Sequence, residues 1–84
     1  MELQGKVALI TGAGQSIGEG LARRFVREGA RVAAVDLDGK LVRAIETGSN
    51  GAILGIPGDM GKLADIEKAF DMAVEQFGGI DILV

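Results

Sequence analysis

Hydrophobic residues along the chain form short continuous runs that alternate with longer stripes of helical spacing. Three runs, at 6–11, 31–36 and 52–56, predict buried strands, because a strand covered on both faces of a parallel sheet is apolar without alternation. A further apolar run at 80–84 begins a fourth strand. The four runs predict a parallel sheet buried on both faces.

The segments between these runs repeat apolar residues every three or four positions, which is typical of amphipathic helices. The first helix is expected from Ser16 or Ile17 to about Glu28, the second over about 40–47, and the third over the stripe from Leu63 to Phe77. The residues expected on the buried faces are Ile17, Leu21, Ala22, Phe25 and Val26 in the first, Leu41, Ala44 and Ile45 in the second, and Leu63, Ile66, Phe70, Ala73, Val74 and Phe77 in the third.

Strands that alternate with helices require crossover connections, so the order βαβαβαβ predicts a parallel α/β sheet with helices on its faces. A chain of 84 residues holds one domain at most. The run 80–84 stays apolar to its last residue, whereas a natural end is usually polar. We therefore expect residues 1–84 to be a single partial domain, truncated before a second half.

A glycine-rich segment, Thr11-Gly12-Ala13-Gly14-Gln15-Ser16-Ile17-Gly18, joins the first strand to the first helix. This arrangement presents backbone N–H groups to a phosphate. Gly12, Gly14 and Gly18 are candidates for the tight turn, the close approach to a pyrophosphate and the packing of helix on sheet. The spacing departs from G-x-G-x-x-G, so an ordinary strand-to-helix turn remains an alternative.

Two carboxylates follow predicted strands at the same edge of the sheet. Asp36, about 20 residues after the glycine turn, is where a dinucleotide fold binds the adenosine ribose, and it would repel the 2′-phosphate of NADP. Its alternative role is a helix cap, which Asp38 could fill equally. Asp59 could meet an adenine edge with Met60 against the ring, or cap the third helix, or do both.

Composition excludes several classes of function. Nine basic and twelve acidic residues give a net charge of −3, and the three aromatic residues are all Phe, so a nucleic-acid surface is not expected. The chain has no Cys and no His, and its carboxylates lack ligand spacing, so we predict neither a disulfide nor a metal site. Without a signal peptide or a membrane-spanning run, a cytoplasmic protein is expected.

Taken together, Thr11-Gly12-(x)3-Ser16-x-Gly18, Asp36, Asp59 and 79–84 resemble the N-terminal half of a short-chain dehydrogenase/reductase, over essentially all of the chain. The resemblance implies half a Rossmann domain with sheet order 3-2-1-4, the NAD-binding half of an oxidoreductase. It assigns Gly12, Gln15, Ser16 and Ile17 to the pyrophosphate and ribose, Asp36 and Leu37 to the adenine ribose, and Asp59 and Met60 to the adenine. Neutral Gln15, and Leu37 where NADP-using relatives often have a basic residue, agree with a preference for NAD over NADP.

Two departures from the family pattern limit this expectation. Ser16 replaces the second glycine of T-G-x-x-x-G-x-G, and its side chain could either crowd the pyrophosphate or donate a hydrogen bond to it. We expect the first effect, with binding weakened by about 1 kcal/mol. The chain has no Tyr, so the family's catalytic phenol is absent and we predict no catalytic residue. We expect weak dinucleotide binding without turnover.

The main alternative is a structural or engineered half-domain that binds nothing. An open, apolar edge at 80–84 would pair with another strand, so we also expect either a homodimer through this edge or completion by a C-terminal half.

Overall fold

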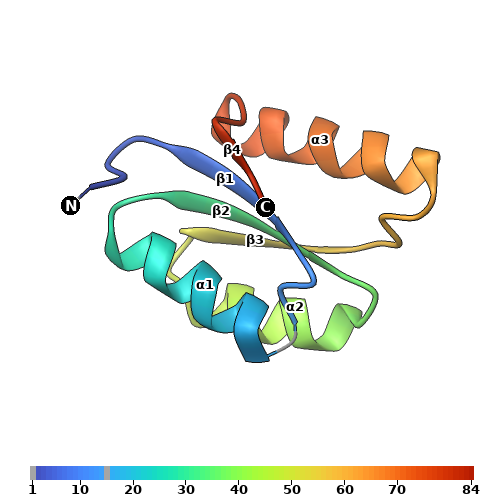
Figure 1. The fold of residues 1–84 in the computed structure, drawn as a ribbon, viewed down its shortest axis with the longest axis horizontal. Coiled ribbons are helices and arrows are strands. Elements are labelled where there is room, and N and C mark those ends of the chain that lie inside the picture. Colours follow the sequence, from blue (N-terminus) through green and yellow to red (C-terminus); the bar gives the residue numbers. More distant parts are fainter. Residues whose placement is uncertain (1, 15) are drawn as a thin grey trace.

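The computed structural model describes residues 2–14 and 16–84, which form three layers with the sheet in the middle (Figure 1). The elements follow the predicted order βαβαβαβ. They are β1 (Val7–Thr11), α1 (Ser16–Arg27), β2 (Arg31–Asp36), α2 (Gly39–Thr47), β3 (Ile53–Pro57), α3 (Leu63–Phe77) and β4 (Ile82–Leu83).

The sheet has four parallel strands in the order β3-β2-β1-β4, which confirms the predicted topology. The chain moves outward from β1 to β3 and then returns to place β4 on the other side of β1. This reversal creates a topological switch point between β1 and β4, where open α/β sheets bind ligands outside the carboxyl ends of their strands.

Alternate side chains of the strands contribute to two separate cores. On one face, α1 and α2 pack over Ala8 and Ile10 of β1, and on the other α3 packs over Leu9. Figure 1 shows the two helices on one side of the sheet and α3 on the opposite side. The first core consists of Ala8, Ile10, Ala13, Ala22, Val32, Ala34, Val42, Ile45 and Ile53, and the second of Leu9, Ala33, Val35, Ile56, Ala69 and Ala73.

Three strands differ slightly from the predicted ranges, and β1 differs only in beginning at Val7. Pro57 is the last residue of β3 and pairs with Asp36, which a proline tolerates because β3 is an edge strand. β4 is shorter than the predicted 80–84 and aligns only Ile82 and Leu83 with β1. Backbone hydrogen bonds from Val84 N to Leu9 O and from Thr11 N to Val84 O continue this pairing beyond the strand.

The predicted buried face of α2 is confirmed at Ile45 and is wrong at Leu41 and Ala44. Val42 and Ile45 are buried against the sheet, whereas Ala44 is exposed and Leu41 is 44% exposed. The helix is rotated so that Val42 faces β3, and the Cβ atom of Leu41 lies beside Gly14 of the glycine turn. Leu41 therefore covers the turn instead of entering the core.

Part of the predicted apolar stripe on α1 and α3 is also exposed. Ile17 is 88% exposed because it lies in the first turn of α1, next to the glycine turn and away from the core residue Ala22. On α3 the fully buried residues are Ala69 and Ala73, whose small side chains allow close packing on the sheet. The large apolar residues of α3 that are exposed are Leu63, Phe70 and Val74.

Candidate functional site

A hollow of about 330 Å³ opens at the carboxyl ends of β1, β2 and β3. Three connections meet there: the glycine turn after β1, the segment after β2 and the segment between β3 and α3. The residues that line the hollow are Thr11, Gly12, Val35, Asp36, Leu37, Gly58, Asp59, Met60 and Gly61. The structure thus brings together five residues that the sequence assigned to cofactor binding from three separate segments.

The glycine turn has the geometry of a sharp strand-to-helix connection. Gly12 has a positive φ of 67°, which residues with a side chain rarely adopt. A Cβ atom on Gly18 would overlap the carbonyl oxygen of Gly12 and would lie 2.9 Å from the Cα atom of Ala13. Gly12 therefore permits the turn, and Gly18 permits α1 to begin directly against it.

Two amides of the turn are bound to β2. Ala13 N donates to the carbonyl oxygen of Val35 at 3.1 Å, and Gly14 N donates to Asp36 Oδ2 at 3.0 Å. Both Ala13 and Gly14 are buried. These bonds fix the turn against the end of the neighbouring strand.

The start of α1 follows immediately and exposes its first residues. The first N–H groups of any helix have no partner within the helix, and here they belong to the turn beginning at Ser16. Ser16 and Ile17 are exposed, and Gly18 is half-buried. Gln15, which the sequence also assigned to the pyrophosphate, lies outside the described residues.

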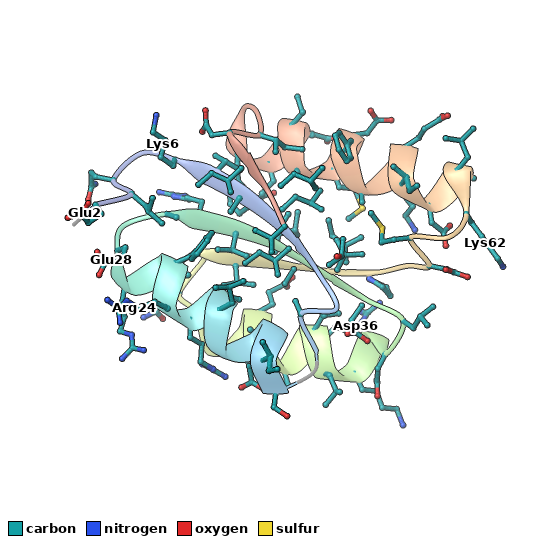
Figure 2. The ribbon with its side chains drawn as sticks, in the orientation of Figure 1. Glu2, Lys6, Arg24, Glu28, Asp36 and Lys62 are labelled. Carbon is teal, nitrogen blue, oxygen red and sulfur yellow. The ribbon has the colours of Figure 1, made fainter. Side chains whose placement is uncertain are left out.

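Among the described residues, Asp36 is the one charged or polar residue that is buried, with 7% of its surface exposed. Its Oδ2 accepts from Gly14 N and its Oδ1 accepts from Asp38 N at 2.8 Å. Figure 2 shows Asp36 where β2 ends, close to the first turns of α1 and α2, while Glu2 and Glu28 lie at the opposite end of the sheet. The carboxylate therefore lies at the meeting point of the turn, the strand and the hollow.

The sequence left open whether Asp36 or Asp38 caps the second helix. In the structure, Asp38 caps α2. Its Oδ1 accepts from Lys40 N at 3.1 Å and from Leu41 N at 3.4 Å, at the start of α2. Asp36 makes neither bond. The two carboxylates thus have separate roles, since one caps the helix and the other faces the hollow.

Asp59 lines the hollow but does not cap α3, so that alternative is wrong. The N-cap residue of α3 is Lys62, which makes no side-chain cap bond and which Figure 2 shows pointing away from the molecule. Asp59 Oδ1 instead accepts from Gly61 N at 2.8 Å, within the preceding turn. Asp65, in the first turn of α3, accepts from Asp59 N at 2.8 Å.

Asp65 is a positioning residue that sequence reasoning missed. It holds the backbone of Asp59 at the rim of the hollow through its Oδ2 atom. The available signal was an acidic residue in the first turn of a predicted helix, where carboxylates accept from free N–H groups. That signal does not reveal that the N–H comes from the preceding loop.

Apolar side chains flank the two carboxylates. Leu37, 75% exposed, follows Asp36, and Met60, half-buried and packed on the α3 core, follows Asp59. Among the described residues that line the hollow, none is basic. The arrangement suits a flat apolar group between Leu37 and Met60, with hydroxyl groups donating to Asp36.

Other kinds of site are not found in the described part of the chain. None of the helices there combines the length and the apolar surface needed to cross a membrane. Within residues 2–14 and 16–84, no three His, Cys, Asp or Glu side chains are grouped so as to hold a metal ion.

Solved structures of other proteins contain the same fold. A 3-ketoacyl-(acyl-carrier-protein) reductase from Brucella melitensis complexed with NADH matches 96% of this chain and 34% of its own, with a TM-score of 0.94 and 44% sequence identity. A short chain dehydrogenase/reductase from Burkholderia phymatum in complex with NAD matches 99% of this chain and 31% of its own, with a TM-score of 0.90 and 29% identity.

Sequence comparison gives the same result. A cis-2,3-dihydrobiphenyl-2,3-diol dehydrogenase from Pseudomonas sp. (strain KKS102) is 42% identical over 84 residues, all of this chain and 30% of the relative. A D-threitol dehydrogenase from Mycolicibacterium smegmatis is 42% identical over 98% of this chain and 33% of its own length. The chain thus spans about a third of the relatives that it matches.

The match to the short chain dehydrogenase family extends over residues 6–84, from the start of β1 through β4. It includes the glycine turn, Asp36 and Asp59, which are the features that build the hollow. The fold, the topology and the sequence agree, and the chain belongs to the short chain dehydrogenase family.

Proposed function

We propose that this chain binds NAD(H) in the hollow at the carboxyl ends of β1, β2 and β3, as the cofactor-binding part of an oxidoreductase. The observation that carries the proposal is the position of Asp36, a buried carboxylate beside the glycine turn. The NADH and NAD complexes of the two structural relatives support a dinucleotide ligand.

Each part of the dinucleotide is assigned to a segment of the site. Gly12, Gln15, Ser16, Ile17 and Gly18 surround the pyrophosphate and the adjoining ribose, with Gly14 behind them. Asp36 and Leu37 bind the adenine ribose, and Asp59 and Met60 bind the adenine. The shared lining of one hollow by Gly12, Asp36, Leu37, Asp59 and Met60 supports this assignment.

The preference for NAD follows from the charge at the ribose position. A carboxylate has about four acceptor positions, and two on Asp36 are used by backbone amides, so two remain for ribose hydroxyls. A 2′-phosphate would instead lie beside a buried negative charge, with no basic residue among the described lining. NADP should therefore bind more weakly than NAD.

Catalysis is assigned to a longer protein and not to these residues. The chain has no Tyr, and its relatives are about three times as long. We propose that residues 1–84 are one part of a larger domain, and that by themselves they bind the dinucleotide weakly and transfer no hydride. The relatives are named for chemically different substrates, so we propose no substrate.

The edge of the sheet at β4 is the proposed partner surface. β4 pairs with β1 on one side, and Leu83 and Val84 are 63% and 47% exposed. An open apolar edge is a template for another strand, supplied by a second copy of the chain or by a further segment of a longer protein. Sedimentation equilibrium tests the first source, and a monomer at high micromolar concentration would contradict a homodimer.

Calorimetric titration with NAD, NADP and AMP tests the cofactor proposal. We expect NAD to bind more tightly than NADP, and Asp36→Ala to weaken NAD binding by roughly ten- to a hundredfold, the effect of losing hydrogen bonds to a charged group. Asp38→Asn, which keeps the α2 cap, is the control. Tighter binding of NADP than of NAD would overturn the assignment of Asp36.

Ser16 provides a second arm of the same experiment. Ser16→Gly restores the family glycine and should tighten NAD binding by roughly fivefold, the equivalent of about 1 kcal/mol. If none of the three ligands binds and neither Asp36→Ala nor Ser16→Gly changes the heat, the alternative of a structural half-domain without a ligand is correct.

A further inference from the structure

We propose that Asp36 is also the positioning residue of the glycine turn, so that one side chain sets both the shape of the pyrophosphate site and the choice of cofactor. The positioning role stands on the contacts of Asp36 alone. Its consequence for dinucleotides rests on the proposed function.

The hydrogen bonds of Asp36 connect two segments that are distant in sequence. Its Oδ2 accepts from Gly14 N at 3.0 Å, a buried bond between residues 22 positions apart, and its Oδ1 accepts from Asp38 N at 2.8 Å. Asp36 ends β2, which is paired on both sides within the sheet. The carboxylate therefore joins the glycine turn to a strand that is paired on both sides.

The hydrogen bond from Gly14 N to Asp36 requires that residue 14 has no side chain. A Cβ atom at this position would lie 3.0 Å from Asp36 Cγ, 3.1 Å from Asp36 Oδ2 and 3.0 Å from Leu41 Cβ, all closer than ordinary contacts. A side chain would push the carboxylate away from the Gly14 amide. Gly14 thus serves the site through Asp36, because its N–H donates to that carboxylate and not to a phosphate.

The shared carboxylate couples two properties that are otherwise separate. Replacing the carboxylate would remove its repulsion of a 2′-phosphate. It would also break the hydrogen bond to Gly14 N and loosen the turn that faces the pyrophosphate. A substitution of Asp36 alone should therefore reduce affinity for both dinucleotides instead of converting the chain to NADP. It should also weaken binding of inorganic pyrophosphate, which does not reach the ribose position.

Amide hydrogen exchange in the ligand-free chain tests the positioning role directly. Asp36→Ala removes both acceptor oxygens, and we expect the Gly14 N–H to exchange about tenfold faster, as for the loss of one buried hydrogen bond. Asp38→Asn removes a carboxylate charge two residues away but keeps the oxygen that makes both cap bonds, so it should leave the exchange rate of Gly14 unchanged. Equal exchange rates at Gly14 in wild type and Asp36→Ala would overturn the proposal.

Titration with inorganic pyrophosphate, followed by the amide shifts of the first turn of α1, tests the coupling. Loss of a negative charge by itself should tighten binding in both Asp36→Ala and Asp38→Asn. If Asp36 positions the turn, Asp36→Ala should instead bind several-fold more weakly than Asp38→Asn. Binding by Asp36→Ala that is as tight as that of Asp38→Asn would contradict the coupling.

Gly14→Ala approaches the same contact from the other side. Its methyl group should displace Asp36 and raise the exchange rate of the residue 14 amide, as Asp36→Ala does. Because both substitutions break one interaction, the double variant should be little worse than either single variant. Additive effects would contradict the proposal.

These outcomes separate the two proposals. Loss of Gly14 protection in Asp36→Ala, together with no binding of NAD by the wild-type chain, would reject the cofactor proposal and retain the positioning role. NAD binding by the wild-type chain, together with equal Gly14 exchange rates in wild type and Asp36→Ala, would do the reverse.

Discussion

The two faces of the sheet differ in how completely they are covered. Among the described residues, α1 and α2 cover one face over a core of nine buried residues, whereas α3 alone covers the other over a core of six. The N-cap residue of α2, Asp38, accepts hydrogen bonds through its side chain, and the N-cap residue of α3, Lys62, makes no side-chain cap bond. The glycine turn and Asp36 lie on the face that is covered by two helices. The face with the larger core therefore positions the pyrophosphate end of the candidate site.

The difference teaches where rigidity is needed. A pyrophosphate site built from backbone amides tolerates little movement, and the turn is fixed by Val35, Asp36 and the close approach of Gly18 to Gly12. The adenine end, at Asp59 and Met60, is held by local hydrogen bonds only. Asp59 N donates to Asp65, and Asp59 accepts from Gly61 N and Lys62 N. The following substitutions test this contrast through the free energy of unfolding, measured by urea denaturation.

Adjacent residues of β1 give the largest expected effect. Ile10 faces the α1 and α2 core and Leu9 faces the α3 core, and both are fully buried. We expect Ile10→Ala to reduce stability by about 4 kcal/mol and Leu9→Ala by about 2.5 kcal/mol, because a cavity under two helices collapses less than one under a single helix. A larger loss for Leu9→Ala would show that the contrast is wrong.

Two buried alanines test the same contrast by overpacking. Ala22 on α1 and Ala73 on α3 each have no exposed surface. Ala22→Leu should destabilise by about 3 kcal/mol, while Ala73→Leu should cost about 1 kcal/mol because α3 can move outward. Equal losses would mean that α3 is held as firmly as α1.

The helix ends give effects of opposite sign. Asp38→Ala removes the cap of α2 and should destabilise by about 1 kcal/mol, and Asp38→Asn should have little effect. Lys62→Asp supplies a cap to α3, where the N-cap backbone is already extended, and should stabilise by about 0.5 kcal/mol. Thermal unfolding followed by circular dichroism measures both, and a less stable Lys62→Asp would count against an uncapped α3.

The smallest effect is expected on the outer surface of α3. Val74 is 49% exposed, so Val74→Gln should change stability by less than about 0.5 kcal/mol. A loss of more than about 1 kcal/mol that grows with protein concentration would indicate that a second copy covers this surface in solution.

The sequence predicted the order, type and approximate range of every element, because buried parallel strands and helical stripes have distinct periods. It also placed Asp36 and Asp59 correctly at one edge of the sheet. Helix rotation was less accurate, since Leu41 and Val42 are equally apolar and only packing against β3 decides between them. The separate roles of Asp36 and Asp38 could not be predicted from the sequence either. Both precede a helix, and only the structure shows from which amides each carboxylate accepts hydrogen bonds.

The connection between β4 and the start of β1 has a consequence for the order of folding. Asp81 accepts from Val7 N at 2.9 Å and donates its own N–H to Val7 O, across 74 positions of sequence. Closing so long a loop costs conformational entropy, which two aligned residue pairs and the hydrogen bonds of Asp81 and Val84 offset. We therefore expect β4 to join the sheet after the transition state, with φ-values near zero, and the β1-β2-β3 unit with its glycine turn to assemble before the last strand docks.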